Sequence, residues 1–177
     1  MDIHELYQKA GELHGHYCPG LAIGVRAAAE ALRILDIREK GHGLYCIAEN
    51  RACYIDGIQM IFGTSWGKGN LEIRPRGKTA FNFYDRGTGK SVRLAAKDRP
   101  KDMSRAEMAE YILSAPLEAV FDQTNVHFEA PEDKDSGRGA PRVCPRCGEK
   151  CREDFLRMVD GEIVCLDCAE KAGFGRD

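Results

Sequence analysis

Apolar residues recur at helical spacing in two segments near the start of the chain. Within residues 3–13 they fall on one helical face, and after Pro19 the same pattern continues over about four turns. Proline suits the first turn of a helix, because its fixed φ fits and its missing N–H is not needed there. The pattern therefore predicts helices over residues 3–13 and 19–35. It is carried by Ile3, Leu6, Tyr7, Ala10 and Leu13, and then by Leu21, Val25, Ala28, Leu32 and Leu35.

A buried strand and a third helix follow. Residues 43–49 form a short apolar run, which is typical of a buried strand and makes Cys46 a core residue. Residues 53–62 have helical periodicity and place Cys53 in the first turn, where the helix dipole favours the thiolate and lowers its pKa. Asp56 shares a face with Cys53. Asp56 therefore either points with Cys53 into a cleft or completes an N-terminal cap.

The next part of the chain reads as a sheet. Residues 70–75, 78–84 and 91–96 predict three antiparallel strands, and residues 124–128 predict a last one. Between them, Ser104 and Glu107 form a capping box that begins a helix over residues 104–113. The expected fold class is α+β, an antiparallel sheet with packed helices, over residues 1–128.

Beyond a polar, proline- and glycine-containing linker at residues 129–142, residues 143–177 predict a small zinc finger. Two Cys-x-x-Cys pairs suit four thiolates on one tetrahedral zinc ion. A hairpin with an Asp-Gly turn lies between the pairs, and a short helix is expected from Ala169. We expect a treble-clef or ribbon-like domain with Cys151 as a bystander. The predicted ligands are Cys144, Cys147, Cys165 and Cys168.

Composition and charge narrow the functional classes. The 177 residues carry a net charge of −2 with a pI near 6.2, so nothing attracts the whole chain to nucleic acid or anionic membranes. No run of about 18 apolar residues predicts a membrane span. The first residues lack the features of a signal peptide, and a cytoplasmic protein is expected. In that reducing compartment the eight cysteines should bind metal, act in catalysis or be buried.

Two local charge imbalances leave alternatives open. Residues 74–101 carry nine basic and two acidic residues, which solvated strand faces would explain, or else an anionic substrate or partner. The glycine-rich residues 63–70 could bind an anion through free N–H groups or form an ordinary loop. The finger has six basic and eight acidic residues, which argues against nucleic-acid binding.

The segment between the first two helices brings His14, His16 and Cys18 into five residues. Imidazole and thiolate together suit zinc, iron, nickel or copper rather than calcium or magnesium. The loop therefore predicts a transition-metal site. The alternative is a turn whose histidines only cap helices or make hydrogen bonds.

Taken together, these motifs resemble the FmdE family, which takes its name from a component of molybdenum formylmethanofuran dehydrogenase. The resemblance rests on residues 14–26, on Cys53 and Asp56 with the Gly-Ile-Gln that follows, on residues 63–71 and on the C-terminal finger. It implies an α+β core, a homodimer and a metal-binding cleft where the motifs meet. Within that cleft it implies His16, Cys18 and Cys53 as ligands, with His14 and Asp56 as further candidates.

Two classes of function follow. The first is a metalloprotein of one-carbon or molybdenum/tungsten metabolism, either a stand-alone enzyme or a partner of such a dehydrogenase. Its core would hold zinc, nickel or iron, with Cys53 as ligand or nucleophile and Asp56 as general base. Nothing in the chain resembles a pterin-binding subunit. The second class is a non-catalytic adaptor or metal-sensing regulator whose finger docks a protein partner. A metal position open to substrate favours the first class, and a closed set of four ligands favours the second.

Overall fold

The computed structural model describes residues 2–38, 41, 43–126 and 140–174, and the chain forms two compact units that divide between residues 130 and 131. The predicted bounds of the core (1–128), linker (129–142) and finger (143–177) stay a prediction, because residues 127–139 lie outside the described residues. None of the described helices combines the length and the apolar character that crossing a bilayer requires.

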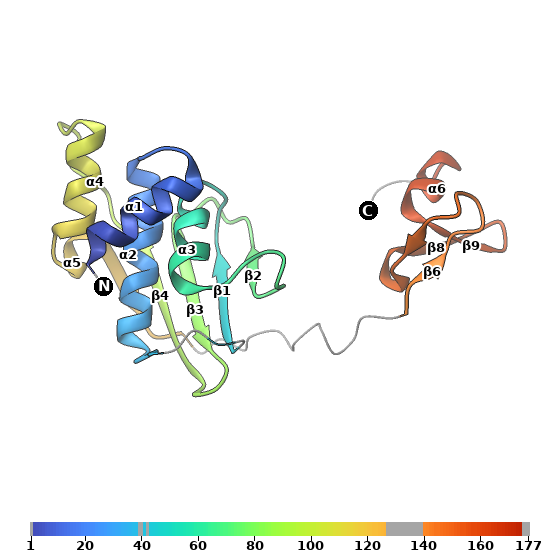
Figure 1. Cartoon of the computed structure of the whole chain (residues 1–177), viewed down its shortest axis with the longest axis horizontal. Helices are drawn as coiled ribbons and strands as arrows, with labels where there is room; N and C mark the ends of the chain where they lie inside the picture. The colour runs from blue at the N-terminus through green and yellow to red at the C-terminus, as the bar shows by residue number, and fades with distance from the viewer. Residues whose placement is uncertain (1, 39–40, 42, 127–139, 175–177) are drawn as a thin grey trace. The chain divides into compact units, whose positions relative to one another are not determined.

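The first unit is an α+β core, as predicted, built on a five-stranded sheet with the order β2-β1-β3-β4-β5. Figure 1 shows α1 to α4 grouped on one side of this sheet. The strands are β1 (Leu44–Ala48), β2 (Leu71–Ile73), β3 (Ala80–Asp85), β4 (Lys90–Ala96) and β5 (Phe121–Thr124). The helices are α1 (Ile3–His14), α2 (Pro19–Ile34), α3 (Tyr54–Phe62), α4 (Arg105–Ser114) and the short α5 (Leu117–Val120).

Two strand predictions are corrected. Residues 70–75 were expected to pair with the next strand in antiparallel fashion, but β2 lies at the sheet edge and runs parallel to β1, with Cys46 opposite Leu71. The physical reason is α3, which lies between β1 and β2 in the chain and supplies the crossover that two parallel strands need. The last strand begins at Phe121 rather than at Thr124, because α5 ends directly before it.

Helices α2 and α3 pack at very close range because both have glycine at the contact. A Cβ atom on Gly24 would lie 2.0 Å from the carbonyl oxygen of Tyr54, and one on Gly57 would lie 2.7 Å from the backbone nitrogen of Val25. The face of small residues seen in the sequence therefore packs against α3 of the same chain. This packing holds the first turns of both helices side by side.

The two faces of the sheet differ. The face towards the helices supplies the aromatic core, in which Phe62 packs on Phe83 and Tyr54 on Phe81. The other face carries an ion pair in which Arg93 donates two hydrogen bonds to the Glu49 carboxylate, at 2.6 and 2.9 Å. These hydrogen bonds, with one from Asn82, hold the pKa of Glu49 below its ordinary value of 4.5.

The second unit contains β6 (Arg142–Val143), β7 (Lys150–Cys151), the 3₁₀ turn η2 (Glu153–Phe155), β8 (Leu156–Val159), β9 (Glu162–Cys165) and α6 (Leu166–Lys171). The predicted hairpin is confirmed, and its turn residues Asp160 and Gly161 both have positive φ. The helix begins at Leu166 rather than Ala169, so Cys168 lies within its first turn. Around the four cysteines, only Val159, Val164 and Ala169 complete the buried cluster of this described unit.

Candidate metal centre

The segment between α1 and α2 is shaped by one glycine and one tyrosine. Gly15 ends α1 in the left-handed conformation, with φ of 84°, and its N–H donates to the carbonyl oxygen of Gly11 at 2.8 Å. The ring of Tyr17 then lies against Gly11, where a Cβ atom would come within 2.1 Å of the ring. The chain is thereby folded back, and the rings of His14 and His16 come to 4.3 Å between centroids.

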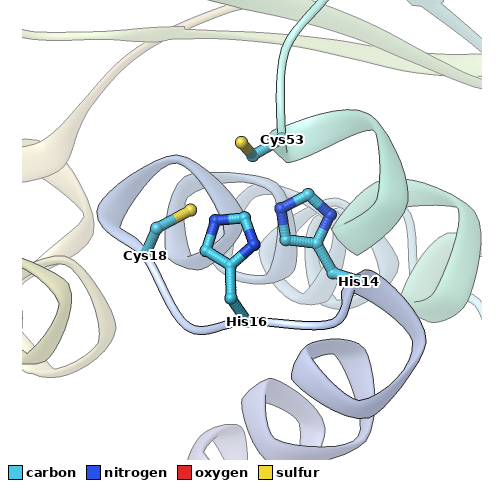
Figure 2. Close-up of side chains that lie close together, drawn as sticks. All are labelled: His14, His16, Cys18 and Cys53. Atoms are coloured by element: carbon cyan, nitrogen blue, oxygen red, sulfur yellow. The ribbon is translucent and has the colours of Figure 1, made fainter.

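Four side chains from three helix ends converge at this point (Figure 2). His14 ends α1, His16 follows in the loop, and Cys18 and Cys53 are the N-cap residues of α2 and α3. Their nitrogen and sulfur donor atoms all lie within 4.8 Å of one another. Of the four, Cys18 is buried, His14 and Cys53 are half-buried, and His16 is exposed. This set, hereafter the core cluster, has the donor types and spacing of a zinc or other transition-metal site.

His14 supplies a specific sign that a cation belongs here. Its Nδ1 lies 2.6 Å from Oδ2 of Asp56, while its Nε2 is buried and has no hydrogen-bond partner among the described residues. A buried polar atom without a partner is costly, and a metal ion would complete the coordination of this nitrogen. The carboxylate fixes the ring orientation in the way that outer carboxylates orient metal-binding histidines. The donor set therefore fits a metal ion.

Two helix N-termini meet at the thiols. Cys18 accepts a hydrogen bond from the N–H of Leu21 at 3.3 Å, and Cys53 caps α3 without such a bond. The dipole expectation for Cys53 is corrected, because its pKa is raised: burial and the neighbouring Cys18 thiol disfavour the thiolate more than the helix end favours it. A bound cation would reverse this balance, since it attracts both thiolates.

A cavity of about 410 Å³ opens beside the two thiols. Gly20 leaves room for it, since a Cβ atom there would lie 3.3 Å from the Cβ of Cys53 and within 3.9 Å of both sulfurs. The cavity extends from the core cluster to the start of α4 and to the segment after β4. Its lining residues are Cys18, Pro19, Gly20, Ile23, Asn50, Ala52, Cys53, Tyr54, Thr79, Arg99 and Arg105.

The second unit has its own donor cluster. The sulfur atoms of Cys144, Cys147, Cys165 and Cys168 also lie within 4.8 Å of one another, as the two pairs predicted, and Cys151 is not among them. Backbone N–H groups, first that of Cys165, lower the pKa of Cys144 to about 6, while burial raises that of Cys168 to about 12. This cluster could hold a metal ion in a zinc-binding domain.

The other candidates take different positions. His4 lies 3.7 Å from Glu110, and His42 and His127 fall outside the described residues. The loop at residues 63–70 uses its polar groups internally: the N–H of Ser65 donates to Asn70, and Lys68 donates to the carbonyl of Gly63. Sequence reasoning missed Arg99 and Arg105 as cavity residues. The only signal was the basic excess of residues 74–101, which includes Arg99.

Three comparisons identify relatives. The family described as "FmdE, Molybdenum formylmethanofuran dehydrogenase operon" matches residues 13–122, a segment that contains the whole core cluster. An FmdE-like protein of tungsten formylmethanofuran dehydrogenase from Syntrophus aciditrophicus, solved at 1.90 Å resolution, superposes with a TM-score of 0.71 at 25% identity. That match covers 98% of this chain and 95% of the other.

A curated relative is more distant in length. A probable S-adenosyl-L-methionine-binding protein from Archaeoglobus fulgidus is 34% identical over 94 residues, which is 50% of this chain but 26% of that protein. The chain thus matches about a quarter of that relative's length. The family match covers well over half of the chain and confirms the resemblance found in the motifs. The chain belongs to the FmdE family.

Proposed function

We propose that this protein is a metalloprotein in which the core cluster binds one transition-metal ion that acts on a small molecule in the adjoining cavity. The observation that carries the proposal is the buried Nε2 atom of His14, which lacks a partner among the described residues while Asp56 holds the opposite ring nitrogen. A ring fixed on one side with a free buried nitrogen on the other is arranged to bind a cation. Zinc, nickel and iron all suit the two imidazoles and two thiolates.

The residues have separate roles in this proposal. Cys18 and Cys53 supply thiolates at two helix N-termini, His14 supplies a fixed imidazole, and Asp56 positions His14 and does not serve as a free general base. His16 is the exposed donor on a loop and is the ligand that exchanges most readily. The metal, when bound, supplies Lewis-acid chemistry next to the cavity. The C-terminal cluster holds a structural zinc that stabilises the small second unit.

The relatives support a place near one-carbon metabolism, because the family name and the S. aciditrophicus protein both refer to formylmethanofuran dehydrogenase. We assign no S-adenosylmethionine binding from the A. fulgidus protein, because three quarters of its length has no match in this chain. The cavity beside the thiols favours action on a small molecule over the alternative, a purely regulatory adaptor. Four ligands that bind too tightly to exchange would favour that alternative.

Cobalt(II) substitution tests the proposal. In a Cys144→Ser/Cys147→Ser variant, which removes the finger site, we expect one cobalt per chain and a thiolate-to-cobalt absorption band. His14→Ala should abolish the band, whereas His16→Ala should retain bound metal. Added azide should shift the spectrum if the site accepts an outside ligand. No stoichiometric cobalt binding would contradict the metal site, and a spectrum insensitive to azide would favour the adaptor.

A further inference from the structure

The cavity beside the core cluster has an uncompensated positive charge. Its lining includes the guanidinium groups of Arg99 and Arg105, and no carboxylate is among its described lining residues. Both arginines are exposed, and neither makes an ion pair or a hydrogen bond with another described residue. A divalent metal with two thiolates and two neutral imidazoles has zero net charge, so metal loading leaves the two arginine charges in place.

The other basic residues of this region are already neutralised. Arg93 pairs with Glu49, Arg74 with Glu72, and Lys97 with Asp122, at 2.6, 2.6 and 3.0 Å respectively. The basic excess of residues 74–101 therefore has two origins. Several charges support the sheet, whereas Arg99 stands at the cavity without a carboxylate partner among the described residues. Arg105 joins it from the first residue of α4, whose cap is already completed by Ser104 and Glu107.

The space and the polar groups also fit a small ligand. A neighbouring cavity of about 430 Å³ shares Ile23, Thr79 and Arg99 with the first, and its one acidic residue among the described lining is Asp98. Tyr54 lines the first cavity, is only 4% exposed, and its hydroxyl has no hydrogen-bond partner among the described residues. A bound molecule with oxygen atoms would give this hydroxyl a partner. The cavity is thus apolar along Pro19 and Ile23, and polar at its two ends.

We propose that this cavity binds a small anion, whose carboxylate or phosphate group is held by Arg99 and Arg105 and whose other end faces Cys18 and Cys53. Guanidinium groups suit both kinds of oxyanion, because their parallel N–H donors match paired oxygen atoms. This inference builds on the proposed metal function, since it names the class of molecule on which the core metal acts. The first turns of α2 and α3 at the thiol end add partial positive charge and favour the same sign of ligand.

The test is a titration of the full-length protein with inorganic phosphate and, separately, with acetate, followed by calorimetry at constant ionic strength with chloride as the balancing anion. We expect saturable binding of at least one of the two anions at one site per chain. Arg99→Gln and Arg105→Gln should each weaken it about tenfold, since each removes charge-assisted hydrogen bonds. Arg38→Gln is the matched control and should change nothing. Arg38 is 88% exposed and follows the far end of α2, about 24 Å along the helix from the cavity.

The outcomes separate this inference from the metal proposal. Metal content is measured on every variant, and a Cys18→Ser/Cys53→Ser protein is titrated as well. Binding that depends on the two arginines and persists in the serine protein supports the anion site, even if the core proves to be metal-free. Absence of binding, or binding that both arginine variants retain at full strength, overturns the anion site, even where the core metal is present.

Discussion

His14 Nδ1 and Asp56 Oδ2 lie 2.6 Å apart and join the end of α1 to the first turn of α3 across 42 positions of the sequence. The side chain of the histidine is only 11% exposed, so this short contact fixes the imidazole among the other three donors. The relationship explains how a loop that looks like an isolated His-x-His-x-Cys motif becomes part of a site with a thiol from another helix.

Replacing Asp56 tests that relationship. Asp56→Asn keeps the size of the side chain but removes its charge, so His14 loses its anionic partner. We expect core metal affinity to fall about 10- to 100-fold, with little change in the fold. Competition with a chromophoric chelator measures the affinity. Asp36→Asn is the control, because Asp36 is 71% exposed and pairs with the surface residue Arg38 at 3.8 Å; an equal loss in both variants would contradict the role of Asp56.

The contact between α2 and α3 predicts a strong effect of a single methyl group. On propensity alone Gly24→Ala would stabilise the helix by about 1 kcal/mol. Its Cβ, however, would lie 2.0 Å from the Tyr54 carbonyl oxygen, and such overpacking typically costs about 1–3 kcal/mol. We expect net destabilisation in urea and weaker metal binding, because Cys18 and Cys53 move apart. Gly67→Ala, which meets nothing within 4 Å, should leave both unchanged. A Gly24→Ala protein as stable as wild type would contradict the close packing.

The ion pair between Glu49 and Arg93 predicts a pH dependence. The pKa of Glu49 is lower in the folded protein than its ordinary value of 4.5. Its contribution to stability is therefore fully present above about pH 4.5 and is lost as the pH falls through the lower, folded pKa. Urea unfolding between pH 3 and 7 should show a smaller loss of stability on acidification in Glu49→Gln than in wild type. Glu12→Gln, an exposed substitution on α1, should follow wild type; identical pH profiles for all three proteins would contradict the assignment.

The finger offers a matched pair of cysteines. Cys165 is one of the four clustered donors, whereas Cys151 packs beside the cluster and is not among them. Cys165→Ser should remove about one metal ion per chain and unfold the second unit, because its few buried residues cannot stabilise it alone. Cys151→Ser should keep both the metal and the fold. Elemental analysis with limited proteolysis checks this, and metal loss in Cys151→Ser would show that the ligand set is different.

Local pattern predicted much of the fold, and non-local contacts account for what it missed. Periodicity placed α1, α2 and α3, and the capping box placed α4, because each depends on residues close in sequence. The parallel pairing of β2 with β1 was missed, since the choice of a sheet partner depends on how α3 packs and not on the strand's own residues. For the same reason β5 was placed three residues too late.

The site shows the same division. His14, His16 and Cys18 are within one loop and form a visible motif, and the family resemblance implied Cys53. The sequence does not decide whether Asp56 is a cleft residue or a cap, because its contact with His14 spans α1, α2 and a strand. Arg99 and Arg105 could not be assigned to the cavity, since only the folded chain brings the start of α4 beside the thiols.

The central claim, a metal ion in the core cluster, is tested most directly by counting metal ions per chain. Inductively coupled plasma mass spectrometry is applied to the full-length protein, to Cys18→Ser/Cys53→Ser and to Cys144→Ser/Cys147→Ser. We predict about two metal ions in wild type and about one in each double variant, since each cluster has four donors for one ion. One ion in wild type that persists in Cys18→Ser/Cys53→Ser and disappears in Cys144→Ser/Cys147→Ser would contradict the claim.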